Sequence, residues 1–211
     1  MLSLRERFGM YDNAPVECLD DSNLFIKSGV TVVASLAGEG KTTFIQAKCS
    51  EWEKDGYEIN HINFDNAPTY GKDMINCPVS DSEFDDFFEI LENEADEKTI
   101  LIIDSLKAMC SYMSIDIDSN VEVYPVMQKF RRLCKKTGIN IIIIHHSFKS
   151  KSVKSILPQF YGSRAIEEQC DSGFIYSKDA IRIVKNRAGY AREDIVDLTV
   201  SVKPFDSKTE K

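Results

Sequence analysis

One stretch decides how this chain folds, the sequence VTVVASLAGEGKTT at residues 30–43. Residues 30–34 are β-branched or small and predict a short strand. A glycine-rich turn follows the strand, and a helical stretch then runs from about Lys41 to Lys54. A strand that leads through a tight turn into a helix is the first half of a unit whose strands lie parallel, with a helix crossing between them.

The same alternation continues through most of the chain. Further strands are predicted at residues 58–64, 99–103 and 139–144, and further helices at residues 82–95 and 120–136. Beyond residue 171 only strands are expected, at residues 173–176, 180–184 and 195–202. The pattern predicts an α/β fold with a mostly parallel twisted sheet, helices on both sides and a C-terminal antiparallel β meander. Because ligands of such sheets bind beyond the carboxyl ends of the strands, the chemistry is expected there.

Length and charge limit what the protein can be. The 211 residues predict one domain at residues 29–205, between a lead-in or arm at residues 1–28 and a polar tail at residues 206–211. The 26 basic residues against 34 acidic ones give a net charge of −8, which argues against a general polyanion binder. Contact with nucleic acid would therefore need a local basic patch.

The cysteines and histidines predict neither a zinc site nor a disulfide framework. The six cysteines form no CxxC pair, and the three histidines, at positions 61, 145 and 146, lack zinc-ligand spacing. Reduced thiols fit the cytoplasm, or the cytoplasm of a host cell if a mobile element encodes the chain. The longest apolar run is four isoleucines. Because a membrane span needs roughly 18 apolar residues, no membrane partner is expected.

The glycine-rich turn has the spacing of a phosphate-binding loop. Four residues separate Ser35 from the sequence GKT at 40–42, as in a Walker A motif with serine in place of the first glycine. The glycines let backbone N–H groups converge on phosphate oxygens at the positive end of the following helix. Lys41 would reach the β- and γ-phosphates, and the Thr42 hydroxyl would bind Mg²⁺. The predicted nucleotide-binding residues are Ser35, Gly38, Glu39, Gly40, Lys41, Thr42 and Thr43.

A second motif fits the first. Residues 100–103, Ile-Leu-Ile-Ile, form an apolar strand that ends at Asp104, the arrangement of a Walker B motif. A strand that ends in aspartate is, by itself, more often only followed by a turn. With the glycine-rich turn upstream, Asp104 is expected to hold Mg²⁺ together with Thr42.

Three later stretches of sequence narrow the choice of protein family that this chain resembles. They are IIIIHHS at 141–147, GSRAIEEQCD at 162–171 and IVKNRAG at 183–189. With the two earlier motifs, and in this order, they resemble RecA-like hexameric helicases: DnaB-type replicative helicases and, through the His-His pair, plasmid-encoded hexameric helicases. The resemblance covers residues 27–205. It implies a RecA-like P-loop ATPase that uses ATP and Mg²⁺, forms a homo-oligomeric ring or filament, and acts on single-stranded DNA with other replication or recombination proteins.

The resemblance also implies roles for residues around the nucleotide. His146 stands where the family has a γ-phosphate sensor, whereas His145 is expected to face the opposite side of the strand and to be structural. Asp65 stands at the place of the family's water-activating glutamate, one methylene shorter, and Glu39 is the alternative base.

Two cations near the end of the chain match a further family motif. Lys185 and Arg187 resemble the lysine and arginine fingers that reach the nucleotide of a neighbouring subunit. The alternative is a pair of solvated charges on an exposed strand. With these two, the predicted catalytic residues are Asp65, Asp104, His146, Lys185 and Arg187.

A basic loop is the candidate DNA contact. The sequence FKSKSVK at 148–154 is basic and serine-rich in a chain that is otherwise acidic. In RecA-like rings and filaments the loop at this place faces the central axis. The resemblance therefore implies contact with single-stranded DNA through Lys149, Lys151, Lys154 and Arg164. The alternative is a surface loop whose lysines are only solvated.

These features favour a compact ATP-hydrolysing DNA helicase that holds ATP between two subunits. Two alternatives share its core. One is a recombinase-like protein in which ATP drives assembly on single-stranded DNA. The other is a regulatory ATPase that acts as a nucleotide switch without DNA. The residues before the first strand suit an arm better than the N-terminal collar of replicative helicases, which keeps both alternatives open.

Overall fold

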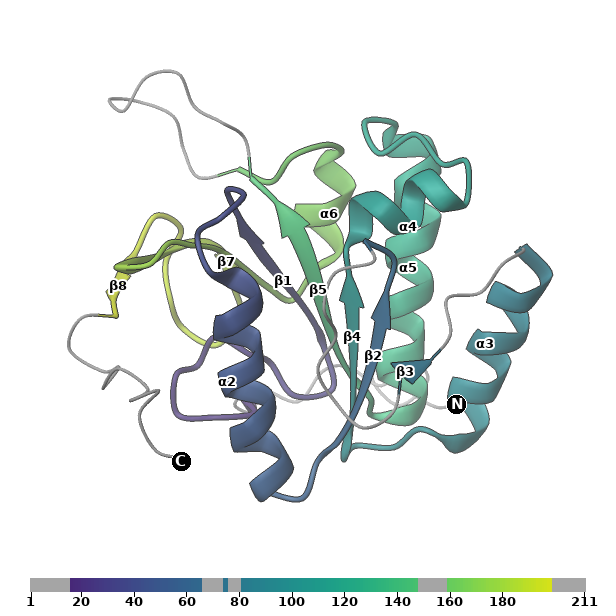
Figure 1. Cartoon of the computed structure of the whole chain (residues 1–211), viewed down its shortest axis with the longest axis horizontal. Helices are drawn as coiled ribbons and strands as arrows, with labels where there is room; N and C mark the ends of the chain where they lie inside the picture. The colour runs from purple at the N-terminus through teal and green to yellow at the C-terminus, as the bar shows by residue number, and fades with distance from the viewer. Residues whose placement is uncertain (1–15, 66–73, 76–80, 148–158, 199–211) are drawn as a thin grey trace, which may run out of the picture.

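The computed structural model describes residues 16–65, 74–75, 81–147 and 159–198. An eight-stranded sheet runs through the middle of the molecule in the order β3-β2-β4-β5-β1-β6-β7-β8 (Figure 1). Its strands are β1 (Val30–Ser35), β2 (Glu58–Asn63), β3 (Met74–Ile75), β4 (Thr99–Asp104), β5 (Asn140–His146), β6 (Ser172–Tyr176), β7 (Ala180–Asn186) and β8 (Ile195–Asp197). Strands β1 to β6 are parallel, and β7 and β8 add to the sheet antiparallel, which confirms the predicted mixed sheet.

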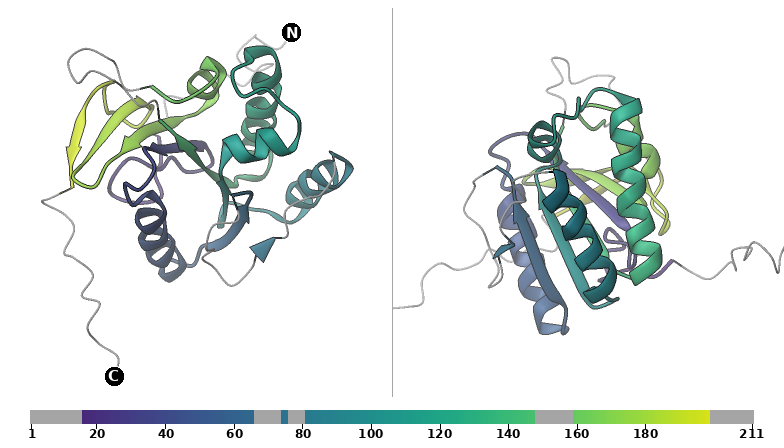
Figure 2. Two further views of the ribbon diagram at one scale, coloured as in Figure 1. Left: turned by 45° about the horizontal axis from the view of Figure 1, so that its top comes forward. Right: turned by 90° about the vertical axis from the view of Figure 1, so that its right-hand side faces the viewer.

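Helices cover both faces of the sheet, as predicted (Figures 1 and 2). They are α2 (Lys41–Lys54), α3 (Asp81–Glu94), α4 (Leu106–Tyr112), α5 (Asn120–Thr137) and α6 (Arg164–Gln169). Helix α2 lies on one face and turns Ile45, Cys49 and Trp52 toward the strands. The other four helices pack against the opposite face. Of the helices in these described ranges, none has the length and apolar character needed to cross a membrane.

The alternation of side chains along β4 decides where its last residue points. Ile100 and Ile102 belong to the core beneath α2, whereas Leu101 and Ile103 belong to the core on the opposite face. Asp104 follows Ile102 by two positions and therefore lies on the α2 face, at the carboxyl end of the strand.

The same alternation separates the two histidines at the end of β5. Ile142 and Ile144 lie in the core beneath α2, so His146 lies on the α2 face. His145 lies on the opposite face, where its Nε2 bonds the Tyr161 carbonyl oxygen at 2.7 Å. The prediction that the two rings face opposite sides is confirmed.

Three short elements are absent from the sequence prediction. Strand β3 has two residues, α4 has seven and α6 has six, which is too short for a clear periodic pattern. Each of the two helices starts with a capping serine: Ser105 accepts a hydrogen bond from the Ala108 N–H, and Ser163 accepts one from the Ala165 N–H. The capping serines were the available signal for these helices. Of the predicted strand at residues 195–202, the part from residue 199 lies outside the described residues.

Residues 16–28 fall within the predicted lead-in, but the segment around Phe25 contributes to the core beneath α2. The Phe25 ring is fully buried, with its centre 4.9 Å from that of Trp52 and 5.6 Å from that of Phe174. Cys18 and Ile26 form an antiparallel bridge that closes this segment on itself. The segment therefore packs with the sheet, and the predicted boundary at residue 28 does not coincide with a change in packing.

Candidate active site

The glycine loop, residues 35–40, connects the end of β1 to the start of α2. Gly38 and Gly40 both have φ of +83°, a left-handed conformation that glycine adopts without steric cost. A Cβ atom at either position would meet nothing within 4 Å, so the backbone conformation, and not lack of space, calls for glycine here. The loop thus exposes its backbone to the space above the sheet.

The N-terminus of α2 is open to an anion. Gly40 is the N-cap and gives no side-chain hydrogen bond, and the first turn of the helix holds no acidic residue. The first N–H groups of a helix lack partners within the helix, and the helix dipole makes this end positive. Because no side chain caps this end, its backbone N–H groups and the positive end of the helix dipole are available to phosphate oxygens.

Lys41, the first residue of α2, points back toward the carboxyl edge of the sheet. Its Nζ donates a hydrogen bond to the His145 carbonyl oxygen at 3.3 Å. Burial lowers the pKa of this ammonium group, while the charges of Asp104 and Asp65 act in the opposite direction. Lys41 therefore lies between the tips of β5, β4 and β2, close to both carboxylates.

Asp104 lies beneath the same edge and is 5% exposed. Burial raises the pKa of its carboxyl group, and the nearby Lys41 and His61 act to lower that pKa. A buried carboxylate of this kind is stabilised by a cation placed against it. Asp104 thus has the environment of a ligand for a cation.

Asp65 and His146 complete the group of residues around Lys41. Asp65 is exposed just beyond β2, where its N–H bonds the Asn63 side-chain oxygen at 3.0 Å. Burial and Lys41 lower the pKa of His146, while Asp65 and Asp104 act to raise it. The structure therefore brings together four predicted site residues from four separate segments: Lys41, Asp65, Asp104 and His146.

Glu39, the alternative base, lies toward the other side of the glycine loop. Its charge contributes to the raised pKa of Tyr176, after the larger effect of burial. Tyr176 ends β6 and stacks on Phe44 of α2 with 4.6 Å between the ring centres. Of the two predicted bases, Asp65 is therefore the one that interacts electrostatically with Lys41 and Asp104.

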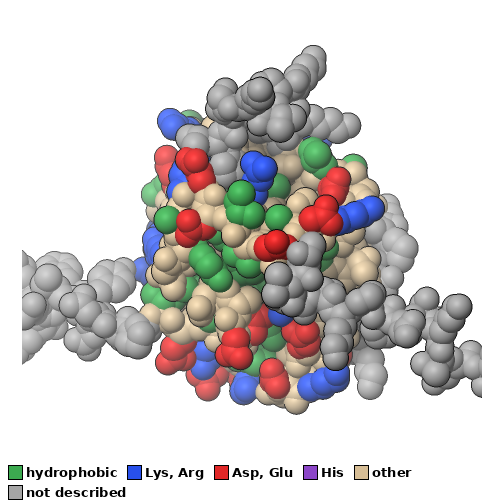
Figure 3. All heavy atoms as spheres, turned by 90° about the vertical axis from the view of Figure 1, so that its left-hand side faces the viewer, with side chains coloured by type: hydrophobic (Ala, Val, Ile, Leu, Met, Phe, Trp, Pro, Cys, Tyr) green, Lys and Arg blue, Asp and Glu red, His purple; other side chains and the backbone are tan. Residues whose placement is uncertain are grey.

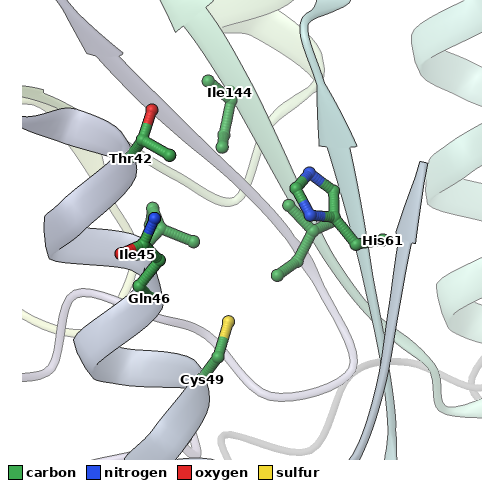
Figure 4. A pocket seen from close by; sticks show the side chains of 7 residues that line it. Thr42, Ile45, Gln46, Cys49, His61 and Ile144 are labelled. Carbon is green, nitrogen blue, oxygen red and sulfur yellow. The ribbon is translucent and has the colours of Figure 1, made fainter. Parts of the chain in front are cut away.

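A small cavity lies between α2 and the sheet (Figure 4). Its volume is about 10 Å³, room for one water molecule at most. Thr42 lies at its upper end, with the hydroxyl directed toward the carboxyl edge, while Cys49 and His61 point into it from opposite sides. The remaining lining residues are Ile45, Gln46, Ile102 and Ile144.

Thr42 and Asp104 fit the donor set that Mg²⁺ prefers. Both offer oxygen, and Mg²⁺ in nucleotide sites is held by one or two protein oxygens, substrate phosphates and water. Among the described residues no three His, Cys, Asp or Glu side chains are grouped as a self-sufficient metal site.

Lys185 and Arg187 lie far from the glycine loop of their own chain. Asn186 pairs with Ser172, and Ser172 pairs with Thr31 near the beginning of β1. Arg187 is therefore level with the amino end of β1, about 16 Å along the strand direction from the glycine loop. Arg187 is therefore remote from the glycine loop of its own chain.

Both cations have partners within the chain. Lys185 Nζ donates hydrogen bonds to the carbonyl oxygens of Glu167 and Glu168, each at 2.8 Å, and thereby caps the C-terminus of α6. Arg187 forms an ion pair with Asp171, and its side chain is 43% exposed. Lys185 is thus hydrogen-bonded to the end of α6, and Arg187 keeps part of its side chain exposed.

Most of the predicted DNA contact lies outside the described residues. This holds for Lys149, Lys151 and Lys154, whereas Arg164 is exposed at the first position of α6. The two ends of the loop are placed by the bridge between Ser147 and Phe160 at the tip of β5. The described residues that flank the loop, Ser147 and Phe160, therefore lie beside His146.

The sequence did not single out His61, Tyr161 or Asp171. His61 faces Asp104, Tyr161 binds the ring of His145, and Asp171 accepts hydrogen bonds from Val30 N–H and Arg187. For His61 the signal was its even spacing from Ile59 and Asn63, which puts it on the α2 face of β2. Tyr161 and Asp171 gave no such signal, because their contacts join segments that are distant in sequence.

Acid is expected to destabilise the fold through His145. The ring is fully buried, and burial lowers its pKa from 6.5 to about 4. Between these two pH values the unfolded chain binds a proton that the folded chain does not, so stability is full above pH 6.5 and falls as the pH drops toward 4. The loss amounts to about 3 kcal/mol.

Urea unfolding at several pH values checks this expectation. His145→Gln keeps a side-chain N–H for the Tyr161 carbonyl but cannot titrate, so the stability of this variant should depend less on pH between 6.5 and 4 than that of the wild type. His146→Gln is the matched control, because His146 is only half-buried. An acid dependence unchanged in His145→Gln would contradict the assignment.

No protein-family model matches the chain, and a search of curated protein sequences finds no match. The resemblance to RecA-like helicases therefore stays a prediction, which depends on the motifs and on the arrangement of the residues that they contain.

Proposed function

We propose that the protein is a magnesium-dependent ATPase of the RecA-like helicase type, which acts as an oligomer on single-stranded DNA. The observation that carries the proposal is the grouping of Lys41, Asp65, Asp104 and His146 beside the open N-terminus of α2. The mostly parallel sheet followed by antiparallel strands agrees with the fold that this family implies.

The phosphates of ATP would bind along the glycine loop and the first turn of α2. Lys41 would exchange its hydrogen bond to the His145 carbonyl for one to the phosphates. The exchange would lose little free energy, because the existing bond is long, at 3.3 Å. Thr42 and Asp104 would hold Mg²⁺. When bound, the ion neutralises charge on the phosphate oxygens.

Asp65 would interact with the attacking water, and His146 would interact with the γ-phosphate. Asp65 is exposed beyond β2 and can accept a hydrogen bond from water, which orients it for attack. His146 lies on the α2 face at the tip of β5, where a ring N–H can donate to the γ-phosphate. Since the basic loop begins two residues after His146, a shift of this ring would reach the predicted DNA contact directly.

The site would be completed by a second copy of the chain. Arg187 is at the opposite edge of the sheet from the glycine loop, so any role toward ATP must be played in a neighbouring subunit. To reach across, Arg187 would leave Asp171, which retains the Val30 N–H and lies 3.8 Å from Arg131 Nε. These partners keep the buried Asp171 carboxylate stabilised after Arg187 has moved.

Single-stranded DNA would bind at the loop that follows β5. The face that carries α2, β7 and β8 has basic and acidic side chains interspersed around apolar ones, so its described part offers no basic path for a phosphate backbone (Figure 3). Arg164 and the ends of the loop lie at the carboxyl edge, beside the proposed nucleotide site. The three lysines between them supply the local positive charge that an acidic protein needs to bind DNA.

ATP hydrolysis measured with and without an oligothymidylate tests the role of DNA. Single-stranded DNA is expected to stimulate hydrolysis several-fold, and replacing Lys149, Lys151 and Lys154 with alanine should remove the stimulation but leave the basal rate. The matched control replaces Lys54, Lys135 and Lys178, which are exposed elsewhere, and makes the same change in net charge.

The outcomes separate the three functions. Stimulation together with strand separation on a forked duplex supports the helicase, and stimulation without strand separation favours the recombinase-like protein. Hydrolysis that DNA does not change, at moderate salt, would favour the regulatory ATPase and contradict the proposed DNA contact.

A further inference from the structure

His61 lies beside Asp104 on the face of the sheet that α2 covers. Its Nε2 atom is 4.0 Å from Asp104 Oδ2, and the two side chains are 6% and 7% exposed. The strands fix this approach: β2 and β4 are paired, Asn63 is level with Asp104, and His61 is two residues earlier on the same face. The ring is thus held against the carboxylate by backbone pairing and not by a flexible loop.

An imidazole is an unusual choice for this position. The neighbouring residues of the sheet on the same face, Ile59, Ile102 and Ile144, are apolar, and the ring borders a cavity of about 10 Å³ that an apolar side chain could fill (Figure 4). A buried polar ring costs stability unless it makes a compensating interaction. The Asp104 carboxylate is one polar group close to this ring, with Oδ2 at 4.0 Å from Nε2.

Lys41 and His61 differ in what happens to them when a nucleotide binds. Both lie near Asp104 and act to lower the pKa of its carboxyl group. Lys41 is on a long side chain that would turn toward the phosphates, whereas His61 is fixed on β2 by the pairing of this strand with β4. After Lys41 has moved, His61 still contacts the carboxylate.

We propose that His61 is a positioning residue that holds the Asp104 carboxylate in the orientation in which one oxygen faces the magnesium of bound MgATP. The inference rests on the proposed function and goes beyond it, since it assigns the support of the metal ligand to a residue outside the nucleotide-binding motifs. The role needs only a ring N–H directed at Oδ2, with no change in protonation. Hydrogen bonds at catalytic sites are often long without ligand and tighten in the complex.

The test compares His61→Leu with His61→Gln, which retains a side-chain N–H donor. At saturating ATP, His61→Leu is expected to raise the Mg²⁺ concentration for half-maximal hydrolysis about tenfold. The affinity for a fluorescent ATP analogue in EDTA should change less than twofold, because Asp104 does not bind the nucleotide without metal. His61→Gln should need less Mg²⁺ than His61→Leu.

Two controls separate positioning from folding. Cys49→Ala changes the opposite wall of the same cavity and should leave the Mg²⁺ requirement unchanged. The Tm of His61→Leu shows whether the fold persists, and the Mg²⁺ requirement is compared only between folded proteins. If His61→Leu does not fold, His61→Met, which also lacks a donor, carries the same expectation.

Equal Mg²⁺ requirements in the wild type and His61→Leu would overturn the proposal, and so would equal impairment by leucine and glutamine. Failure of the wild-type protein to bind the ATP analogue at all would instead refute the proposed function. The two failures are therefore distinguishable.

Discussion

Replacing Lys41 with alanine is expected to lower the rate of ATP hydrolysis at least about 100-fold. The substitution removes the cation that lies between the tips of β2, β4 and β5 and that would contact the phosphates. Release of inorganic phosphate at saturating MgATP measures the effect. The fold should persist, because Lys41 is partly exposed and gives up one long hydrogen bond of 3.3 Å.

Lys54→Ala is the matched control for this variant. Lys54 is the last residue of the same helix and is exposed, so its loss changes the charge equally but at the far end of α2. Its hydrolysis rate should stay within twofold of the wild type. If Lys41→Ala is folded and hydrolyses ATP at the wild-type rate, the glycine loop takes no part in hydrolysis.

Replacing Arg187 with alanine is expected to lower kcat about 1,000-fold while the Kd for MgATP changes little. The arginine is too far from the glycine loop of its own chain to bind that nucleotide, so binding should be unaffected. Its contribution would come from a neighbouring subunit, where it offsets charge that develops on the γ-phosphate. Steady-state kinetics and calorimetry measure the two constants.

Mixing the two inactive proteins tests whether the arginine acts between subunits. An interface between the intact glycine loop of Arg187→Ala and the intact arginine of Lys41→Ala would be complete. Random assembly places such a pair at about a quarter of the interfaces, so a comparable share of the wild-type rate should return. A mixture as inactive as its components, although subunits exchange, would contradict the shared site, and so would full activity of Arg187→Ala in a strictly monomeric state.

The sequence predicted most of the fold because its strands and helices carry strong local patterns. The isoleucines at 141–144 and the strand at 100–103 are apolar on both faces, which is typical of central strands in a parallel sheet. The glycine loop could be recognised because its function depends on neighbours in sequence. The period of two along a strand separated His145 from His146, which lie on opposite faces of β5.

The rest of the site depends on pairing between distant strands. His61 approaches Asp104 only because β2 and β4 are neighbours in a particular register, and spacing within β2 does not reveal that register. The same applies to Lys185, which binds the end of α6, a six-residue helix without a periodic signal. Arg187 was predicted as a finger, but its ion pair with Asp171 required the hairpin of β6 and β7 to be placed.

The proposed function requires one triphosphate with magnesium to bind at the carboxyl edge of the sheet, between the glycine loop and Asp104. Calorimetric titration of the purified chain with ATP, with magnesium and with EDTA, measures this binding. We expect saturation at one ATP per chain, tighter binding with magnesium, and loss of this binding in Lys41→Ala. No binding at millimolar MgATP, or equal binding by the wild type and Lys41→Ala, would contradict it.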